Sequence, residues 1–239
     1  MCAILKRMAE RTGASIRARV RAELIEEIKA AARRQLATEG ANLSLRAIAR
    51  EMGMASSALY RYFASRDDLL TALIIDAYDA IGEAAEKADA RHRPRHDYAG
   101  RWLAAARALR SWALDHSSEY ALIHGSPVPG YRAPADTTGP ASRVPLVLTG
   151  IVAEALAAGA LLAVPGPAIG PKLAAELVAI GNQIDRDLGE QVLARAMLAW
   201  TEMYGALSFE LFGQLNNVID RRADWFDYQA RSVATFIGL

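Results

Sequence analysis

The chain has little cysteine and few of the residue pairs that bind metals. Cys2 is the only cysteine among its 239 residues, which excludes a disulfide framework and a cysteine-based zinc site. His92 and His96 are four residues apart, but Pro94 between them disfavours the helix that would bring both side chains to one metal ion. We therefore expect no metal and no cofactor, in a protein suited to a reducing compartment.

The motifs of common hydrolases and nucleotide-binding enzymes are also missing. The chain contains neither a Gly-x-Ser-x-Gly elbow nor a Gly-x-Gly-x-x-Gly fingerprint. Residues 166–172 contain two glycines and a lysine, but the prolines among them remove backbone donors, and no Ser or Thr follows Lys172. We expect that the protein is not an enzyme.

A leader peptide and a membrane span are not expected either. The first 15 residues carry three basic side chains and no apolar core segment, unlike a secretory signal. Residues 144–164 form a run of 21 without lysine or arginine, but Glu154 lies at its middle, where a charge costs about 3 kcal/mol in a membrane. We expect this run to be a buried helix of a soluble, cytoplasmic protein that has no membrane partner.

Helix-forming residues, in contrast, are abundant. Roughly a fifth of the chain is alanine, and no segment alternates apolar and polar residues as a strand does. All nine prolines lie between Pro94 and Pro171, which leaves both ends free to form long helices. The predicted fold class is all-α, with an irregular stretch at 125–140. Apolar spacing and end signals place helices at 17–38, 44–52, around Leu59 and Phe63, and at 66–90, 98–115, 142–163, 172–184, 190–215 and 222–237.

Charge is spread unevenly along the chain. Residues 1–70 contain 13 Lys and Arg against 8 Asp and Glu, whereas the remaining 169 residues contain 15 against 19. A basic N-terminal part indicates a polyanionic partner for that part, although ordinary solvated surface charge explains the same numbers equally well. Arg17, Arg19 and Arg21 either follow a nucleic-acid backbone or lie on a solvated helix end.

Residues 44–63 have the layout of a helix-turn-helix. Ser44 is a helix cap, Gly53 allows a tight turn, and the second helix turns only Leu59 and Phe63 inward. The other face of that helix carries small residues, which allow a close approach to a DNA major groove. It also carries Arg and Tyr side chains, which reach phosphates and base edges.

The string from Gly40 to Leu70 resembles the N-terminal domain of TetR-family transcriptional regulators. Its Ile-Ala-x-x-x-Gly, Leu-Tyr-x-x-Phe and Ser-Arg-x-x-Leu elements are in register. The resemblance implies a basic arm at 1–16, a three-helix DNA-binding domain at 17–66, and a larger helical ligand-binding and dimerisation domain at 67–239. By position it implies DNA contacts by Arg46, Ser56, Ser57, Ala58, Tyr60, Arg61, Tyr62 and Arg66.

Two details of this domain remain open. Ala55 stands where the family commonly has Ser or Thr as the helix cap, so either Ser56 caps the helix or its first turn frays by about 1 kcal/mol. Tyr60 matches a phosphate-contacting tyrosine of the family, and Tyr62 matches the recognition face. Both rings could instead pack against the first helix.

A second resemblance lies near the C-terminus. Residues 200–205 resemble the Trp-x-x-x-His-Gly element of one group of TetR C-terminal domains, with Tyr204 in place of the histidine. Aromatic side chains with polar tips suit a cavity for a mostly apolar small molecule, although core packing explains each of them equally well. Trp102 is one such aromatic residue. The candidate cavity residues are Trp112, Tyr120, His124, Tyr131, Trp200 and Tyr204.

The predicted helix 190–215 has two apolar faces and only a narrow polar line, so both faces must be covered. One face fits the core of the subunit, and the face of small residues fits a twofold partner, with helix 222–237 completing a four-helix interface. Burial of both faces within one subunit is the alternative. The candidate interface residues are Val192, Ala196, Ala199, Met203, Ala206, Phe226, Ala230 and Val233.

Taken with these features, the family resemblance implies a homodimeric repressor that a small molecule releases from a palindromic double-stranded DNA operator. The family resemblance further implies that helix 66–90 transmits the ligand signal. The alternatives are a ligand-independent architectural DNA binder and a helical enzyme that keeps the helix-turn-helix as a structural domain. DNA binding that no metabolite changes would identify the first, and a cluster of reactive side chains would identify the second.

Overall fold

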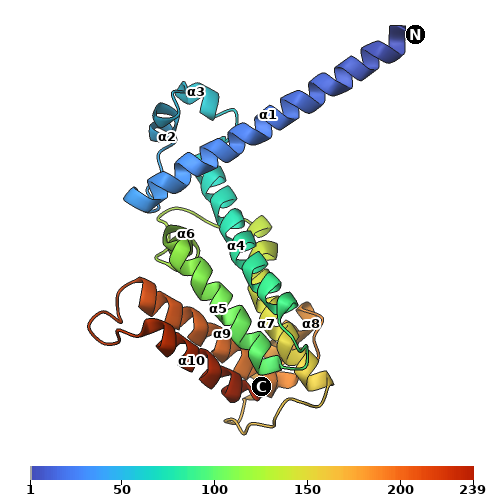
Figure 1. The fold of residues 1–239 in the computed structure, drawn as a ribbon, viewed down its shortest axis with the longest axis vertical. Coiled ribbons are helices and arrows are strands. Elements are labelled where there is room, and N and C mark those ends of the chain that lie inside the picture. The colour runs from blue at the N-terminus through green and yellow to red at the C-terminus, as the bar shows by residue number, and fades with distance from the viewer. Residues whose placement is uncertain (1) are drawn as a thin grey trace. The chain divides into compact units, whose positions relative to one another are not determined.

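The computed structural model describes the backbone of residues 2–239 and the side chains of residues 16–239. The described backbone forms ten α-helices and one 3₁₀ turn without a strand, so the all-α prediction is confirmed (Figure 1). The helices are α1 (Cys2–Glu39), α2 (Leu45–Glu51), α3 (Ser56–Leu59), α4 (Arg66–Arg91), α5 (Tyr98–Asp115), α6 (Ser117–His124), α7 (Thr138–Ala157), α8 (Pro171–Gln183), α9 (Gly189–Leu211) and α10 (Arg222–Ile237). The 3₁₀ turn is η1 (Ala135–Thr137).

The chain folds as two compact units. The N-terminal unit comprises the residues up to Ile74 together with Pro127–Ala133, and the C-terminal unit comprises Ile75–Ser126 and Pro134–Leu239. Helix α4 passes from the first unit into the second, so its first turns belong to the N-terminal core and its later turns to the C-terminal core.

The N-terminal unit is built on one face of α1. This helix begins at Cys2, well before the predicted start at Arg17, because residues 2–16 contain no proline to stop it. The side chains of the predicted basic arm up to residue 15, and Cys2 with them, lie outside the described part of the chain. The α1 residues Ile28, Ala31, Ala32 and Leu36 are buried in this core.

The two short helices of the N-terminal unit follow the predicted signals. Ser44 caps α2, since its hydroxyl accepts the N–H of Ala47 at 3.3 Å. Gly53 has a φ of +66°, a left-handed turn conformation that glycine adopts without strain. Helix α3 is a single turn, and Ala55 at its N-cap makes no side-chain capping bond, as expected for alanine.

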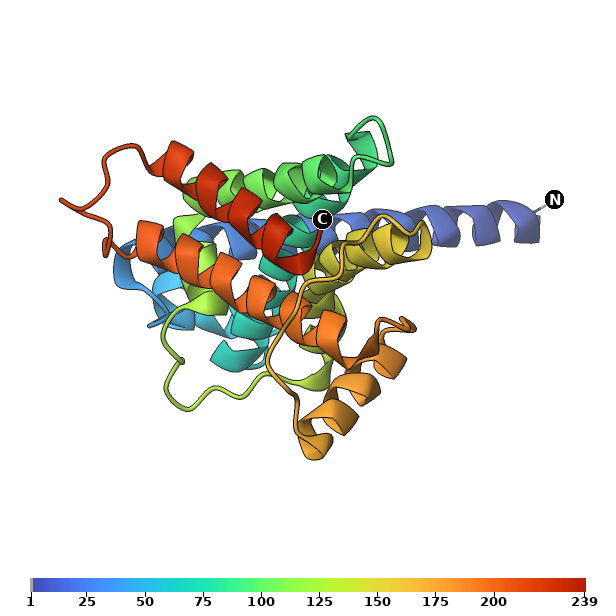
Figure 2. The same cartoon turned by 90° about the horizontal axis from the view of Figure 1, so that it is seen from below.

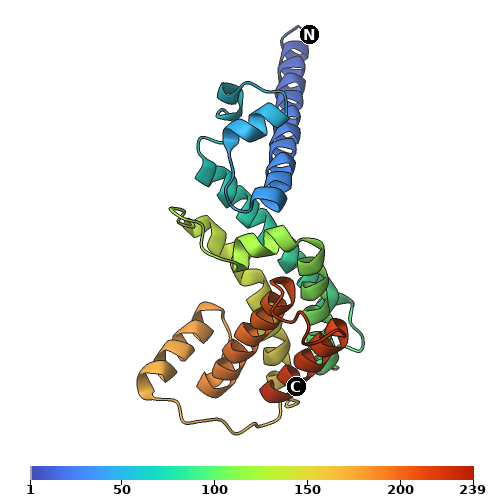
Figure 3. The ribbon, with the colours of Figure 1, turned by 90° about the vertical axis from the view of Figure 1, so that its left-hand side faces the viewer.

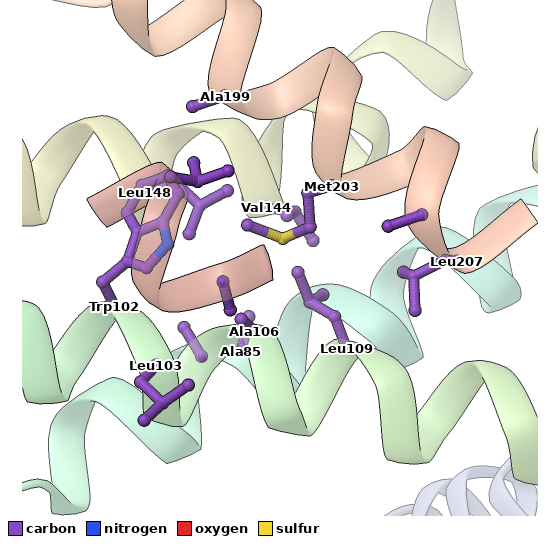
Figure 4. Packing of buried hydrophobic residues seen from close by; sticks show 14 of the residues in the cluster. Ala85, Trp102, Leu103, Ala106, Leu109, Val144, Leu148, Ala199, Met203 and Leu207 are labelled. Atoms are coloured by element: carbon purple, nitrogen blue, oxygen red, sulfur yellow. The ribbon is translucent and has the colours of Figure 1, made fainter. Parts of the chain in front are cut away.

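Helix α5 lies at the centre of the C-terminal unit. It packs against α7, α9 and α10, and Figure 2 shows α9 and α10 running side by side. Helix α8 in turn lies along α9 (Figure 3). The buried core joins Trp102 and Leu109 of α5 to Leu148 of α7 and to Met203 and Leu207 of α9 (Figure 4).

Several helix ends differ from the predicted ones. Helix α6 occupies a segment to which the sequence patterns assign no helix, and α7 begins at Thr138, inside the stretch predicted to be irregular. Pro140 does not prevent this start, because proline is tolerated in the first turn of a helix. Helix α7 ends at Ala157, and α9 ends at Leu211. The glycines that follow, Gly159 and Gly213, have φ values of +66° and +84° and leave the helical conformation.

Helix α7 carries the long apolar run. Together with the turn before it, Ala135–Ala157 is long and apolar enough to cross a membrane. Its side chains Val144, Leu148 and Ile151 are buried, however, and α7 packs against α5 and α9. Residues 144–157 of the apolar run thus belong to a core helix, as predicted, whereas residues 158–164 lie outside any helix and Leu162 retains 68% of its surface.

Candidate nucleic-acid interface and ligand cavity

Helices α2 and α3 present polar and basic side chains at the surface of the N-terminal unit. Arg46 of α2, Ser57 of α3, and Tyr60 and Arg61 just after it are exposed, and Tyr60 retains 45% of its surface. The other four predicted DNA contacts are half-buried: Ser56, Ala58, Tyr62 and Arg66. The inward residues Leu59 and Phe63 are both buried, which fixes the outward direction of this face.

Three arginines on this surface are available for an external anion. Arg46, Arg50 and Arg61 form no ion pair with any residue whose side chain the structure describes, whereas Arg34 donates to Glu51 at 2.8 Å. An unpaired guanidinium is well suited to bind phosphate or a guanine edge. Arg50 was not among the predicted contacts, although its place on the polar face of α2 is the signal that would have found it.

Two of the predicted contacts are engaged inside the unit. The guanidinium of Arg66 donates to the carbonyl of Ala41 at 2.6 Å, which ties the start of α4 to the turn after α1. The guanidinium of Arg21 lies over the ring of Tyr62 at 5.0 Å and donates to the carbonyl of Arg61. Tyr62 therefore packs against α1, which is one of the two arrangements that the sequence allows. The side chains of Tyr60 and Arg61 remain exposed to solvent.

A cavity of about 190 Å³ lies in the C-terminal unit, between α5, α7, α8 and α9. Of the six predicted cavity residues, only Trp200 lines it. Ala196, predicted at the dimer interface, lines it as well. The complete lining is Trp102, Ser142, Pro145, Leu146, Leu148, Thr149, Ile180, Ile184, Leu193, Ala196, Met197 and Trp200.

Three other predicted cavity residues form an aromatic cluster of their own. The ring of His124 lies 4.1 Å from that of Tyr204 and 5.0 Å from that of Tyr120. The hydroxyl of Tyr120 donates to the Tyr204 carbonyl at 3.1 Å and lies 3.0 Å from the Ser208 hydroxyl. Burial raises the pKa of Tyr120 to about 12 and lowers the pKa of His124 to about 4. Trp200 touches this cluster through an edge contact with Tyr204 and so joins it to the cavity.

The last two predicted cavity residues lie elsewhere. Trp112 of α5 stacks on His116, the residue that caps the C-terminal end of the same helix, and the two ring centres are 5.0 Å apart. Tyr131 belongs to the N-terminal unit, where its hydroxyl pairs with that of Thr71 at 2.9 Å.

Most lining residues are aliphatic, which is why the sequence does not single them out. Ile180 and Ile184 repeat at helical spacing near the end of α8, and the same pattern marks any core helix. Trp102 and Trp200 are the aromatic residues of the lining, and both stand out in the sequence as candidates for a cavity.

The predicted interface residues are mostly buried within the single chain. The apolar faces of α9 and α10 pack on one another, and Ala199 and Phe226 retain 1% and 3% of their surface. Of the eight residues only Val192 is not buried. Burial within one chain is what the alternative expects, but Ala199 and Val233 also line a groove at the surface of these two helices. The exposed apolar residues on these helices include Leu198, Tyr228 and Phe236, which line the same groove with Trp225.

Two clusters of ion pairs fasten α7 to its neighbours. Arg143 donates to Glu86 through two bonds of 2.8 and 2.7 Å and to the Asp79 carboxylate at 2.7 Å, all within the C-terminal unit. Arg101, fully buried, bridges Asp89 at 2.6 Å and Glu154 at 2.5 Å. These guanidinium groups hold the pKa of Glu86 and of Glu154 below its usual range. Helix α7 is thus tied to α4 and α5 by charge as well as by packing.

The geometry defines a class of protein: one that combines a helix-turn-helix carrying exposed arginines in one unit with a helical unit that contains an apolar cavity. Comparison with known proteins agrees. Residues 28–73 match the profile of bacterial regulatory proteins of the tetR family, and residues 102–233 match the tetracyclin repressor-like C-terminal domain.

Individual relatives and solved structures point the same way. The chain is 41% identical to the HTH-type transcriptional regulator Mb1846 of Mycobacterium bovis over 189 residues, which cover 76% of this chain and 78% of that protein. The crystal structure of the regulatory protein SCO4313 is 37% identical, with a TM-score of 0.74 over 91% of this chain and 98% of that one. A Rhodococcus sp. RHA1 protein of unknown function is 25% identical, with a TM-score of 0.65 over 90% and 93%.

The chain belongs to the TetR family of transcriptional regulators. It is a soluble, DNA-binding regulator of the helix-turn-helix type, as the sequence predicts. Members of this family bind DNA and small-molecule effectors, are usually dimers, and are typically ligand-responsive repressors.

Proposed function

We propose that the protein is a cytoplasmic repressor that binds a palindromic operator as a homodimer and leaves it when a small, mostly apolar molecule occupies the cavity lined by Trp102 and Trp200. The observation that carries the proposal is that one unit holds a helix-turn-helix with exposed arginines, which pair with none of the described side chains, while the other unit holds a cavity without charged lining residues. We keep the proposed boundaries of 1–16 for the arm, 17–66 for the DNA-binding domain and 67–239 for the effector and dimer domain.

Direct DNA contact is assigned to the exposed residues Arg46, Ser57, Tyr60 and Arg61. Arg and Tyr donors reach phosphates and base edges from a helix laid in the major groove, and small side chains permit the approach. Ser56 and Ala58 lie on the same short helix, α3, and would lie where this helix comes closest to the DNA. Tyr62 and Arg66 would act mainly by holding the helix in position, because both are engaged within the unit.

The dimer surface is assigned to the exposed apolar groove of α9 and α10. Leu198, Tyr228 and Phe236 retain 57%, 63% and 42% of their surface, which is unusual for apolar side chains grouped along two adjacent helices. A second copy related by a twofold axis would cover the groove with the same groove, giving a four-helix interface. Ala199 and Val233, two of the residues that the sequence suggested for this role, line the same groove, and the other buried ones would support the interface from behind.

Helix α4 would carry the effector signal, since it follows the helix-turn-helix in the chain, and Glu86 and Asp89 in its later turns pair with Arg143 of α7 and Arg101 of α5, two helices that line the cavity. The effector must bind better to the form of the dimer that does not fit the operator, and its effect is limited by that difference in affinity. A hundredfold loss of operator affinity requires about 2.7 kcal/mol of such coupling.

Genomic fragments captured by the purified protein would identify the operator, and footprinting would test the proposal. Two recognition helices of one dimer require half-sites with centres about 34 Å apart, or a multiple of that distance. A footprint without inverted-repeat symmetry would contradict the homodimer on a palindrome. DNA binding that no compound changes would favour an architectural binder. Membership of a family of transcriptional regulators favours a DNA-binding regulator over an enzyme.

A further inference from the structure

One face of helix α1 changes character towards its N-terminal end. Ile28 and Ala32 on this face are buried in the core of the N-terminal unit. Arg21 and Arg17 lie on the same face, because steps of four and seven residues return to one side of an α-helix. Both arginines are exposed. The face that packs on the core at residues 28 and 32 therefore presents guanidinium groups at residues 17 and 21.

Arg21 marks the place where α1 passes the end of the recognition segment. Its guanidinium lies 5.0 Å from the centre of the Tyr62 ring and donates to the carbonyl of Arg61 at 3.4 Å. Arg17 lies about one helical turn, or about 6 Å, further towards the N-terminus. Figure 1 shows α1 continuing past α2 and α3, and Arg17 is exposed in that part of the helix. A long polyanion that lies across the end of α3 would next meet Arg17.

The acidic residues of this part of α1 lie on the other side of the helix. They are Glu23, Glu26 and Glu27. At about 100° per residue, they are turned by about 140–240° from Arg21. Arg19 is on that side too and pairs with Glu23 at 3.5 Å. Arg17, in contrast, forms no ion pair with any residue whose side chain the structure describes. Between residues 16 and 32, the face of Arg17 thus carries no carboxylate that would repel a polyanion.

We propose that the DNA-binding surface of each subunit continues from the helix-turn-helix onto α1, and that Arg17 binds a phosphate of the double-stranded DNA beside the bases that α3 reads. This inference rests on the proposed function, because it adds a contact to the DNA surface assigned to α2 and α3. A guanidinium binds phosphate oxygens through charge-assisted hydrogen bonds, and such a contact carries no sequence information. Arg21 holds α1 against the recognition segment, whereas Arg19 takes no part, since it is paired and turned away.

The salt dependence of DNA binding counts such contacts. The full-length protein is titrated into a fluorescein-labelled duplex of arbitrary sequence, and anisotropy between about 50 and 200 mM salt gives the slope of log K against log salt. Each phosphate contact contributes about 0.9 to the magnitude of this slope and about eightfold to the affinity at about 0.1 M salt. Arg17→Ala should remove one such contribution. Alanine favours helix, so the change should leave α1 folded.

Arg19→Ala is the matched control, because it removes the same charge from the same stretch of α1 on the side that pairs with Glu23. Its slope should equal that of the unmodified protein. Arg17→Lys should also keep the slope, since lysine presents the same charge to a phosphate. An unchanged slope in Arg17→Ala overturns the proposal. An equal fall in Arg19→Ala overturns it as well, because the duplex would then respond to net charge alone.

Tyr60→Phe, measured on the same duplex, keeps this inference and the proposed function distinguishable. If Tyr60→Phe weakens binding and Arg17→Ala does not, the helix-turn-helix binds DNA as proposed and the extension onto α1 fails. If Arg17→Ala weakens binding and Tyr60→Phe does not, the contact on α1 stands and the assignment of Tyr60 to the DNA surface fails.

Discussion

Arg143 of α7 crosses α4 at Gly82, where only a glycine leaves room for it. A Cβ atom on Gly82 would lie 2.7 Å from the Cβ of Arg143, closer than two such carbons can approach. The approach lets Arg143 reach Glu86 and Asp79 on the same helix. Pro145, two residues further along α7, lines the cavity, so the cavity wall and the fastening to α4 belong to one short segment.

This contact predicts that Gly82→Ala destabilises the protein even though alanine favours helix. The added methyl must push α4 and α7 apart, and we expect the free energy of unfolding to fall by about 1–3 kcal/mol. Gly205→Ala is the control, because Gly205 of α9 is also helical and nothing lies within 4 Å of the position its Cβ would take. That change should raise the free energy of unfolding by about 0.5–1 kcal/mol. Urea unfolding followed by circular dichroism measures both, and a stabilised Gly82→Ala protein would show that the two helices are not in tight contact.

The exposed hydroxyl of Tyr60 predicts a uniform effect on DNA binding. A phosphate contact carries no sequence information, so Tyr60→Phe should weaken binding to the operator and to unrelated DNA by a similar factor, roughly tenfold. Fluorescence anisotropy with labelled duplexes of both kinds gives the two ratios. Unchanged affinity for both would mean that the ring serves packing alone.

Arg61 should behave differently, because an unpaired arginine at a recognition helix is placed for base contact. We expect Arg61→Met to cost about 1–3 kcal/mol on the operator and to relax the base preference at one position of each half-site. Arg34→Met is the matched control in the same unit, since Arg34 is paired with Glu51. Binding to operators substituted one base pair at a time tests both. A uniform loss across all sequences would reassign Arg61 to a phosphate.

If the exposed groove of α9 and α10 forms the dimer interface, a charged side chain introduced into it should separate the two subunits. Leu198→Glu or Tyr228→Glu should give monomers by light scattering and abolish tight operator binding, because the carboxylate would be buried between two copies. Val218→Glu is the control, as Val218 retains 70% of its surface and lies outside the groove. Helicity must be retained in all three proteins. A dimer that persists in both groove variants would place the interface on another surface.

The sequence was sufficient for the helix-turn-helix because its signals are local. The cap at Ser44, the left-handed turn at Gly53 and the inward pair Leu59 and Phe63 each depend on neighbouring residues, and each lies in the structure as predicted. The length of α1 was not predicted, since helix-forming residues without a proline carry no sharp start signal.

The cavity and the α9 surface could not be predicted in the same way, because they depend on which helices pack together. A helix with two apolar faces is consistent with a partner subunit or with two neighbours in one chain. In the structure α10 packs on α9 and buries Met203 of this face, an arrangement that depends on which helices meet and that no local pattern predicts. Likewise Ile184 of the α8 end and Pro145 of α7 are ordinary apolar residues in the sequence, and they form a cavity wall only because α5 and α9 close the other sides.

His124 predicts a loss of stability in mildly acidic solution. Its ring packs among Tyr78, Tyr120 and Tyr204, its Nε2 atom is buried without a hydrogen-bond partner in the described part of the chain, and burial lowers its pKa to about 4 from an ordinary 6.5. The unfolded chain therefore binds a proton more readily than the folded one between these two pH values. The corresponding stability is complete above pH 6.5 and is lost as the pH falls towards 4, by up to about 3 kcal/mol.

Between pH 6.5 and 5 the paired carboxylates, such as Glu86 and Glu154, keep their contribution, because their pKa values are lowered and they lose it only below about 4.5. Burial raises the pKa of Glu202, so its protonation in the folded chain offsets part of the fall that His124 causes. We expect the free energy of unfolding to fall by about 2 kcal/mol from pH 7 to pH 5, measured by urea unfolding at each pH. In His124→Phe most of this fall should disappear, since phenylalanine fills the same aromatic site without a proton to take up. His96→Phe, at an exposed histidine, should keep the fall of the unmodified protein. If His124→Phe still shows the full decline, the acid sensitivity arises elsewhere, and the imidazole is accommodated with its charge.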